Sequence, residues 1–233
     1  MIKACVFDAY GTLFDVAAAA RSYAQGLPAE DPLQERWSAL AESWRVKQLE
    51  YSWLRAADGR YRDFWALTGD ALDYALEAHA IDAAAEAPRE ALLALYHRLG
   101  AFPEAGAALS ALKRAGAATA ILSNGTPDML SAAVAAAGFE DRLDAVLSAD
   151  AVKAFKPDPK VYALATAEFG CEPEEILFFS ANGWDVCSAA AYGFRGVWVN
   201  RRGAPTDRLG VALECVIKDL VVAPGIYEEL ADA

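Results

Sequence analysis

The stretch KACVF at residues 3–7, followed directly by Asp-Ala-Tyr-Gly-Thr at residues 8–12, decides the fold of this chain. A short apolar run that ends in a glycine-containing turn is typical of a buried β-strand. Similar runs recur farther along the chain, at residues 117–122 (AATAIL), 144–148 (DAVLS), 175–179 (EILFF) and 196–200 (GVWVN). The sequence therefore predicts a series of short, buried strands that begins with residues 3–7.

Segments with a helical pattern separate these predicted strands, at residues 103–115, 127–137, 159–169 and 185–192. Strands that alternate with helices imply right-handed βαβ crossovers and a parallel sheet covered by helices on both faces. We therefore expect an α/β fold with a doubly wound, mostly parallel sheet, which is a Rossmann-like core.

Residues 17–97 break this rhythm, because they offer long helical patterns and no convincing strand. One helix face in this segment carries large apolar residues at a spacing near 3.6 residues: Trp37, Leu40, Trp44, Tyr51 and Leu54. A stripe of this kind is more typical of core packing than of a ligand site. We expect a helical cap domain at residues 17–97, inserted into a catalytic core made of residues 1–16 and 98–233.

The composition restricts the class of protein and its partners. The chain has 233 residues, of which 55% are hydrophobic and 23% charged, and its apolar runs are too short to cross a membrane. The net charge of −12 opposes binding to nucleic acid or an anionic membrane, because such binding depends on clustered Lys and Arg. The first residues, MIKACVF, lack the basic region and long apolar stretch of a secretory signal, so we expect a cytoplasmic protein.

The cysteines and histidines show neither a disulfide framework nor the spacing of metal ligands. No CxxC pair occurs among the cysteines, which lie mostly in apolar stretches: Cys5, Cys171, Cys187 and Cys215. Reduced core residues are the interpretation that this pattern favours. His79 and His97 lie in separate helical stretches and have no assigned role. We expect no metal site.

Polar residues follow four of the predicted strands, where an open parallel sheet binds its ligands. They are Asp8 with Thr12, then Ser123 with Asn124, then Lys156, and finally Ser180, Asn182 and Asp185. Each of them alone is explained equally well as a helix cap, a turn residue or a solvated charge. Their occurrence together at the ends of separate strands predicts one site that holds two carboxylates, an ammonium group and several hydroxyl and amide groups.

This set of polar residues resembles that of the haloacid dehalogenase superfamily, whose members carry an aspartate nucleophile, a Ser or Thr, a Lys and an acidic loop in this order. The closer resemblance is to its L-2-haloacid dehalogenase branch, the type II haloacid dehalogenases. Five blocks carry it: FDAYGTLFD (7–15), WRVKQLEYSWLR (44–55), ILSNGTPDML (121–130), FKPDPKVYAL (155–164) and FSANGWD (179–185). The second and last blocks are the most specific to this branch, and the blocks span both the expected cap and the expected core.

The resemblance implies a hydrolase that converts short (S)-2-haloalkanoic acids to (R)-2-hydroxy acids with inversion and without a cofactor. Asp8 would attack the halogen-bearing carbon and form an ester, which water then cleaves. Thr12 would position Asp8, and Lys156 would keep it ionised by charge pairing. Ser123 would bind the substrate carboxylate near the start of a helix.

The other implied roles concern the attacking water, the halide and the pocket. Asp185, helped by Ser180 and Asn182, would orient and activate the water. Arg45 from the cap, with Asn124 and Trp184, would form the cradle for the departing halide, and a desolvated guanidinium suits a large, soft anion. The remaining substrate-binding positions that the resemblance implies are Tyr10, Leu49, Phe64 and Tyr162, and core packing is an equal explanation for Leu49 and Phe64. The resemblance also implies a homodimer.

Two departures from the phosphatases of the superfamily favour carbon–halogen chemistry. Phosphatases usually carry a second aspartate two residues after the nucleophile, where this chain has Tyr10, and the last loop, SANGWD, brings one carboxylate instead of two. Fewer carboxylates argue against a magnesium site, and a halide leaves without being protonated. A small-molecule phosphatase and a catalytically silent scaffold protein remain the alternatives. Ala181 and Val46 replace a serine and a glutamine that are common in the branch, which leaves water positioning and substrate fit open.

Overall fold

The computed structural model describes residues 1–81 and 86–231, so residues 82–85 of the expected cap and 232–233 of the expected core lie outside the described residues. Its centre is one sheet of six parallel strands in the order β3-β2-β1-β4-β5-β6. The strands are β1 (Ala4–Phe7), β2 (Ala118–Ser123), β3 (Ala145–Ser148), β4 (Ile176–Ser180), β5 (Arg195–Val199) and β6 (Cys215–Ile217). The expected doubly wound parallel α/β fold is confirmed, with β6 as an edge strand that the sequence did not predict.

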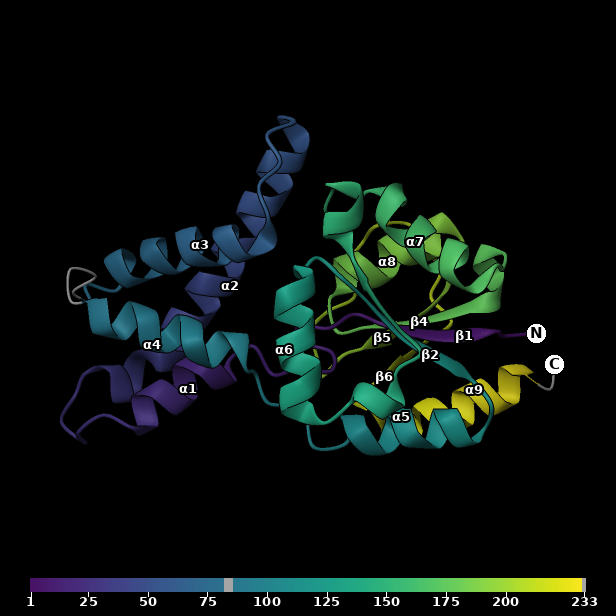
Figure 1. Cartoon of the computed structure of the whole chain (residues 1–233), viewed down its shortest axis with the longest axis horizontal. Helices are drawn as coiled ribbons and strands as arrows, with labels where there is room; N and C mark the ends of the chain where they lie inside the picture. Colours follow the sequence, from purple (N-terminus) through teal and green to yellow (C-terminus); the bar gives the residue numbers. More distant parts are fainter. Residues whose placement is uncertain (82–85, 232–233) are drawn as a thin grey trace.

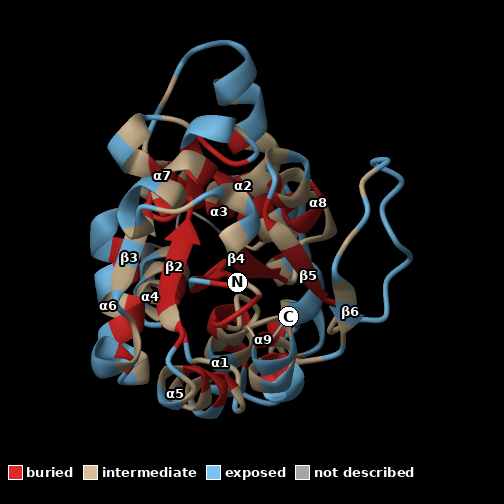
Figure 2. Cartoon of the chain, turned by 90° about the vertical axis from the view of Figure 1, so that its right-hand side faces the viewer, coloured by how far each residue is buried: buried red, intermediate tan, exposed pale blue. Residues whose placement is uncertain are grey.

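The strand order reverses at β1, which lies between β2 and β4. Ala4 is in register with Ala118 on one side and with Ile176 on the other, so the carboxyl ends of these three strands lie next to one another. All residues of β1 and β4 are buried, as Figure 2 shows for the centre of the sheet. Ligands of such sheets bind at the point where the order reverses. This point is the carboxyl edge formed by β1, β2 and β4.

Helices cover both faces of the sheet (Figure 1). Successive strand residues point to opposite faces: Phe7 and Phe179 belong to one apolar cluster, and Val6 and Phe178 belong to the other. The first cluster includes residues of α5 (Ala105–Arg114), α6 (Pro127–Ala137) and α9 (Ala223–Ala231), and the second includes residues of α7 (Pro159–Phe169) and α8 (Gly183–Tyr192). Short 3₁₀ turns lie at Glu140–Arg142, Ala149–Val152, Pro173–Glu175 and Leu220–Val222.

Four further helices lie between β1 and α5: α1 (Ala18–Gln25), α2 (Leu33–Ala57), α3 (Phe64–Ala78) and α4 (Glu86–His97). They form a group beside the sheet, at the end of the molecule away from both termini (Figure 1). The chain leaves and re-enters the sheet region through two paired segments, because Asp15 N donates to Gly100 O and Phe102 N donates to Leu13 O. In the described part of the chain, none of the helices combines the length and the apolar character needed to cross a membrane.

The apolar stripe expected on α2 is only partly buried. Leu40 and Trp44 are buried, whereas Leu54 is 56% exposed, so its assignment to the packed face was wrong. Leu54 lies ten residues after Trp44, and at about 100° per residue this turns it roughly 80° around the helix axis. Gln48 and Ser52 continue the buried face instead, and Gln48 Nε2 donates to Thr68 Oγ1 on α3 at 2.7 Å. The seam between α2 and α3 is therefore partly polar.

Candidate active site

Three charged residues meet at the carboxyl edge of the sheet. Asp8 directly follows β1, and its backbone N–H donates to Phe179 O on β4. Lys156 Nζ lies 3.1 Å from Asp8 Oδ1 and 2.9 Å from Asp185 Oδ2. All three residues are buried: Asp8 is 5% exposed, Lys156 1% and Asp185 0%. A buried ammonium group thus bridges two buried carboxylates. The three residues come from three separate parts of the sequence.

The electrostatics of this cluster favour a charged lysine. Burial alone lowers the pKa of Lys156, but the Asp185 and Asp8 carboxylates outweigh burial, so the pKa is raised above the usual 10.5. Burial raises the pKa of the Asp185 carboxyl, while the contact with Lys156 opposes that shift. A carboxylate with a raised pKa is a stronger base than an exposed aspartate. The cluster therefore combines a lysine whose charged form is favoured with a carboxylate suited to accepting a proton.

The second oxygen of Asp8 accepts two hydrogen bonds. Thr12 Oγ1 donates to Asp8 Oδ2 at 3.2 Å, and Asn182 Nδ2 donates to the same oxygen at 2.8 Å. The Thr12 hydroxyl is itself fixed, because it accepts from Ala181 N at 2.8 Å. The Asp8 carboxyl is therefore held in one orientation, with one donor on Oδ1 and two on Oδ2, as a carboxylate nucleophile needs.

Hydroxyl groups surround Asp185. Ser180 Oγ donates to Asp185 Oδ2 at 2.9 Å and accepts from Asn182 N at 3.2 Å. Tyr162 OH donates to Asp185 Oδ1 at 2.8 Å. Tyr162 is 1% exposed and belongs to the apolar cluster under α7, with its ring 6.1 Å from that of Phe178. The structure thus places Tyr162 within the core, with its hydroxyl on Asp185 Oδ1. The sequence analysis expected this side chain in the substrate pocket.

Arg45 reaches the site from α2. Its Nη2 donates to Tyr10 O at 3.0 Å and to Asn182 Oδ1 at 2.8 Å. The approach passes Gly11, which has φ +91°, and a Cβ atom there would lie 3.4 Å from Arg45 Nη2. A glycine permits both this backbone conformation and the close passage of the guanidinium. Asn182 therefore contacts Arg45 through its oxygen and Asp8 through its nitrogen.

One of the residues after β2, Asn124, binds the backbone of the loop that carries Lys156. Ser123 is 1% exposed, and its Oγ accepts from Gly125 N at 3.2 Å. Asn124 Oδ1 accepts from Lys156 N at 2.8 Å, which holds the loop that carries the lysine. Of the three residues expected in the halide cradle, Arg45 and Trp184 line a common cavity, whereas Asn124 is not part of its lining.

Aromatic rings pack around Tyr10, which lies two residues after Asp8. The Tyr10 ring lies 6.3 Å from the Phe64 ring and 5.7 Å from the Tyr96 ring, between centroids. Burial, together with Tyr96 and Asp8, raises the pKa of Tyr10, so its hydroxyl stays protonated. A Cβ atom at Gly125 would lie 2.8 Å from Tyr10 Cε2, so this glycine makes room for the ring. Tyr10 and Phe64 are buried and packed together.

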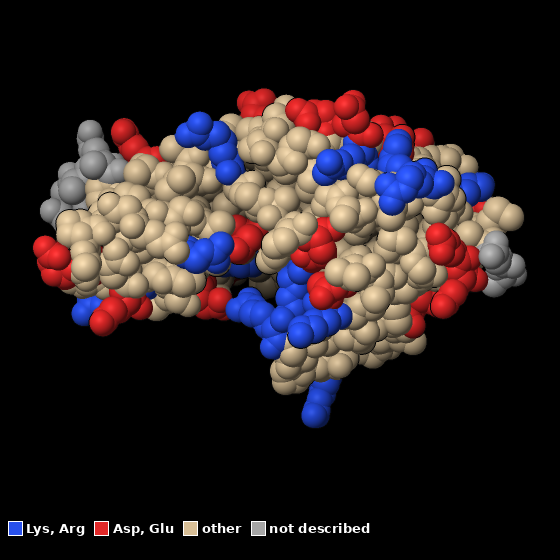
Figure 3. All heavy atoms as spheres, turned by 90° about the horizontal axis from the view of Figure 1, so that it is seen from below, with Lys and Arg blue, Asp and Glu red and all other residues tan. Residues whose placement is uncertain are grey.

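A cavity of about 540 Å³ lies between α2 and the loops that follow β1, β4 and β5. Arg45, Val46 and Leu49 line it from α2, and Asn182 and Trp184 line it from the loop before α8 and the start of that helix. The surface seen in Figure 3 is hollowed near its middle, with Lys and Arg side chains gathered beside the hollow, although the chain as a whole carries a net charge of −12. The cavity connects Arg45 and Asn182 to the surface loops.

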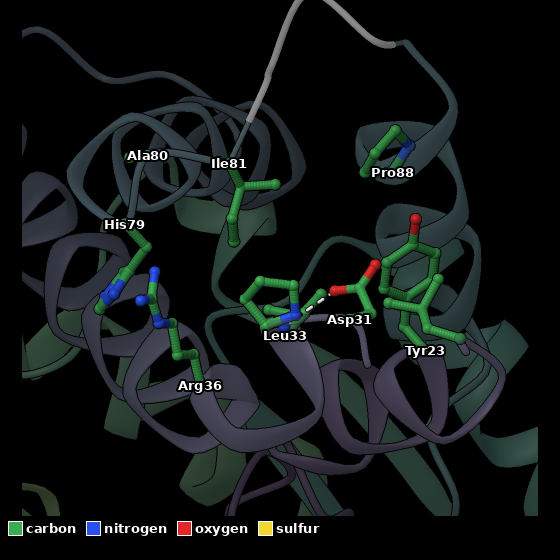
Figure 4. Close-up of a pocket in the computed structure, with 10 residues that line it drawn as sticks. Tyr23, Asp31, Leu33, Arg36, His79, Ala80, Ile81 and Pro88 are labelled. Carbon is green, nitrogen blue, oxygen red and sulfur yellow. Dashed lines mark hydrogen bonds between the residues drawn. The ribbon is translucent and has the colours of Figure 1, made fainter. Parts of the chain in front are cut away.

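A second cavity, of about 230 Å³, lies within the group of helices (Figure 4). Tyr23, Arg36 and His79 are among the residues that line it, and Asp31 Oδ1 accepts from Leu33 N at its edge. His79 Nε2 lies 2.8 Å from Ser43 Oγ. None of the residues expected in the site lines this cavity, so it is separate from the cluster around Asp8.

The structure adds residues that the sequence analysis missed. Gln48 and Thr68 form a buried polar network with Tyr96 that supports the ring of Tyr10. No sequence signal distinguishes this network from ordinary helix packing. Arg201 Nη2 donates to Thr12 O at 2.7 Å. It directly follows the run GVWVN at residues 196–200, so the strand-end argument applies to it as well.

Comparisons with known proteins agree with this geometry. The family model for haloacid dehalogenase-like hydrolases matches residues 2–193. The chain is 45% identical over 206 residues to (S)-2-haloacid dehalogenase 1 of Pseudomonas sp. (strain CBS-3), covering 88% of each protein. The chain belongs to the haloacid dehalogenase-like hydrolase family, in the branch of the (S)-2-haloacid dehalogenases.

Two comparisons involve one further relative in this branch. The (S)-2-haloacid dehalogenase of Xanthobacter autotrophicus is 48% identical over 201 residues, which cover 83% of this chain and 73% of that protein. The structure of the L-2-haloacid dehalogenase from the same organism, with chloropropionic acid covalently bound, superimposes with a TM-score of 0.85 at 39% identity. That comparison covers 98% of this chain and 99% of the other.

Proposed function

We propose that the protein hydrolyses short (S)-2-haloalkanoic acids to (R)-2-hydroxy acids through an ester on Asp8, with inversion at the substrate carbon. The observation that carries the proposal is the buried Asp8 carboxylate, fixed by Lys156, Thr12 and Asn182, beside an Arg45 guanidinium that binds only neutral oxygens of the described chain. Relatives named (S)-2-haloacid dehalogenases and a related structure with covalently bound chloropropionic acid support it.

In the first step, Asp8 Oδ1 attacks the carbon in line with its bond to the halogen. We assign Oδ1 because Oδ2 already accepts from Thr12 and Asn182. The new O–C bond forms as the C–halogen bond breaks, and the halide leaves with the bonding electrons towards Arg45. Two neutral acceptors leave the charge of Arg45 uncompensated, so it is free to stabilise the halide.

The substrate itself is held by groups on either side of Asp8. Ser123 and the backbone N–H groups before α6 bind its carboxylate, because a helix start stabilises an anion. Thr126 caps this helix by accepting from Met129 N, which fixes its start. Asn124 and Trp184 complete the halide cradle, and Tyr10, Leu49 and Phe64 contact the rest of the substrate. Tyr162 acts through Asp185 and not on the substrate.

In the second step, water attacks Cγ of the Asp8 ester. The negative charge that develops on Oδ2 is stabilised by Thr12 and Asn182, the two donors already on this oxygen. Asp185 accepts the proton of this water, and Ser180, whose hydroxyl donates to Asp185 Oδ2 at 2.9 Å, holds that carboxylate in place. The bond between Cγ and the ester oxygen then breaks, and the departing alkoxide takes back the water proton held by Asp185 and leaves as the hydroxy acid. The Asp8 carboxyl loses the remaining water proton to solvent and returns to the carboxylate.

We further propose that residues 17–97 act as a cap domain over a core of residues 1–16 and 98–233. The position of α1 to α4 between β1 and α5, with Arg45 on α2, supports this division. The cluster holds two carboxylates, both paired with Lys156, and Tyr10 stands where the phosphatases have a further aspartate, which supports a reaction without a metal or another cofactor. The resemblance to the dehalogenase branch supports a cytoplasmic homodimer.

The test is halide release from the separate enantiomers of 2-chloropropionate in the presence of EDTA, with Asp8→Asn as the control. Release from the (S) enantiomer alone, with (R)-2-hydroxypropionate as the product and no effect of EDTA, is expected. Release of phosphate from a generic ester in the presence of magnesium, without release of halide, would assign the site to phosphoryl transfer. A folded protein that is inactive on every 2-haloacid would identify a silent scaffold.

A further inference from the structure

Arg201 holds the loop that carries the nucleophile without contacting the nucleophile. It follows the last strand residue of β5 by two positions, and its side chain is 15% exposed. Its Nη2 donates to Thr12 O at 2.7 Å, and its Nη1 donates to Glu104 Oε1 at 2.6 Å. Its Cζ lies 3.7 Å from the centroid of the Phe102 ring, so the guanidinium stacks on that ring. Only a planar guanidinium can donate to two partners through its separate nitrogens and stack on an aromatic ring at the same time.

These contacts join three segments of the chain. Thr12 belongs to the loop after β1, Phe102 and Glu104 belong to the segment that returns from the helices to α5, and Arg201 follows β5. The return segment is itself bound to the nucleophile loop, because Phe102 N donates to Leu13 O. Arg201 therefore fixes the backbone of Thr12, while Ala181 N fixes its hydroxyl.

We propose that Arg201 is a positioning residue for hydrolysis of the Asp8 ester, acting through Thr12; this inference rests on the proposed function. Thr12 donates to Asp8 Oδ2, the oxygen on which negative charge concentrates when water attacks the ester. During ester formation the Asp8 carboxylate loses charge, so that step gains nothing from a stronger donor on Oδ2. A hydrogen bond that strengthens only in the second transition state accelerates only the second step.

Two variants test this role, and a third serves as the control. Arg201→Lys keeps the charge beside Glu104, but an ammonium group cannot contact Glu104 and Thr12 in the same fork geometry. The double variant Arg201→Gln with Glu104→Gln removes both charges together, so it leaves no buried charge without a partner. The matched control is Arg195→Lys, at the other end of β5, where the arginine lies 4.0 Å from Glu214 on the surface.

The experiment is a single turnover of (S)-2-chloropropionate with enzyme in excess, quenched with acid at intervals. Released chloride reports formation of the ester, and the mass of the peptide that carries Asp8 reports its decay. For both Arg201 variants we expect ester decay to slow about tenfold, while chloride release stays within about twofold of the wild type. The Arg195→Lys protein should match the wild type in both rates.

Steady-state kinetics give an independent readout. The ratio kcat/KM reports only the steps up to halide release, so slower ester hydrolysis lowers kcat and KM together and leaves kcat/KM unchanged. A merely structural role would lower kcat and kcat/KM by the same factor, because less of the protein would be active. Ester decay at the wild-type rate in both Arg201 variants would overturn the role of Arg201 alone. Absence of chloride release from the wild type would reject the proposed function and this inference with it.

Discussion

The two sides of the site differ in how their charges are compensated. On the core side, Lys156 is 1% exposed and bridges two carboxylates, and every charged group has a charged partner. On the side of the helices, Arg45 lines an open cavity, and within the described residues it binds a carbonyl and an amide oxygen but no carboxylate. The core side is thus complete before any ligand arrives, whereas the side of the helices lacks an anion. This difference supports the proposal that the first side forms the bond to the substrate and the second binds the halide.

The backbone explains why the two sides differ. Asp8 and the loop of Asp185 follow neighbouring parallel strands, whose register fixes their positions. Arg45 lies on α2, a helix that packs on α3 through a polar seam and leaves Val46 half exposed beside the cavity. Groups held by a buried sheet stay fixed, and groups on a surface helix adjust more readily to a ligand.

The largest expected effect is that of Asp8→Asn, which removes the nucleophile and nearly preserves its shape. Halide release should fall at least about 10⁴-fold, because the amide oxygen does not form the ester. Circular dichroism at neutral pH should show the wild-type fold, since Lys156 keeps its contact with Asp185. Halide release at the wild-type rate would remove Asp8 from the reaction and with it the assignment of the core side.

The next effect tests whether the core side depends on its charge pairing. Lys156→Met leaves the Asp8 and Asp185 carboxylates buried together without a cation, so the free energy of unfolding should fall by about 3–5 kcal/mol. The matched control is Lys153→Met, whose lysine is 64% exposed and pairs with Asp150 at 2.8 Å. An exposed pair of this kind contributes about 0–1 kcal/mol. If urea melts gave the same loss of unfolding free energy for both variants, the buried cluster would stabilise the protein no more than the exposed pair does.

Arg45→Ala tests the other half of the comparison. Halide release should slow about 100-fold, because one charged donor to the leaving group is lost, and the urea midpoint should change little, since no carboxylate loses its partner. Inhibition of the wild type by added bromide should also disappear in the variant. The control is Arg36→Ala, on the exposed face of the same helix. An unchanged rate with intact bromide inhibition would place the halide site elsewhere.

The core side could be predicted from the sequence because it depends on strand ends. Asp8, Ser123 and Ser180 lie at or directly after apolar runs, and parallel topology brings the ends of neighbouring strands together. Arg201 follows the run GVWVN, so the same argument applied to this strand would have found it. Its partner Glu104 lies in the return segment, and no local pattern predicts that contact.

Other features depend on packing, which local patterns do not determine. The strand β6 has three residues, Cys215–Ile217, between Glu214 and Lys218, which is too short for a periodic signal. Leu54 matched the helical spacing only approximately and is exposed. Tyr162 was expected against the substrate, but α7 packs on the sheet face that directs this side chain behind Asp185.

The smallest expected effect is that of Tyr162→Phe, which sharpens the role of Asp185. Burial raises the pKa of Asp185, and the hydrogen bond from Tyr162 is among the contacts that lower it. Losing that bond raises the pKa further, and Asp185 must be ionised to accept a proton. The acid limb of kcat should therefore move to higher pH than in the wild type, while the rate at neutral pH falls about fivefold or less. Tyr227→Phe on α9 is the control, and an acid limb that stays in place would separate Asp185 from the proton transfer.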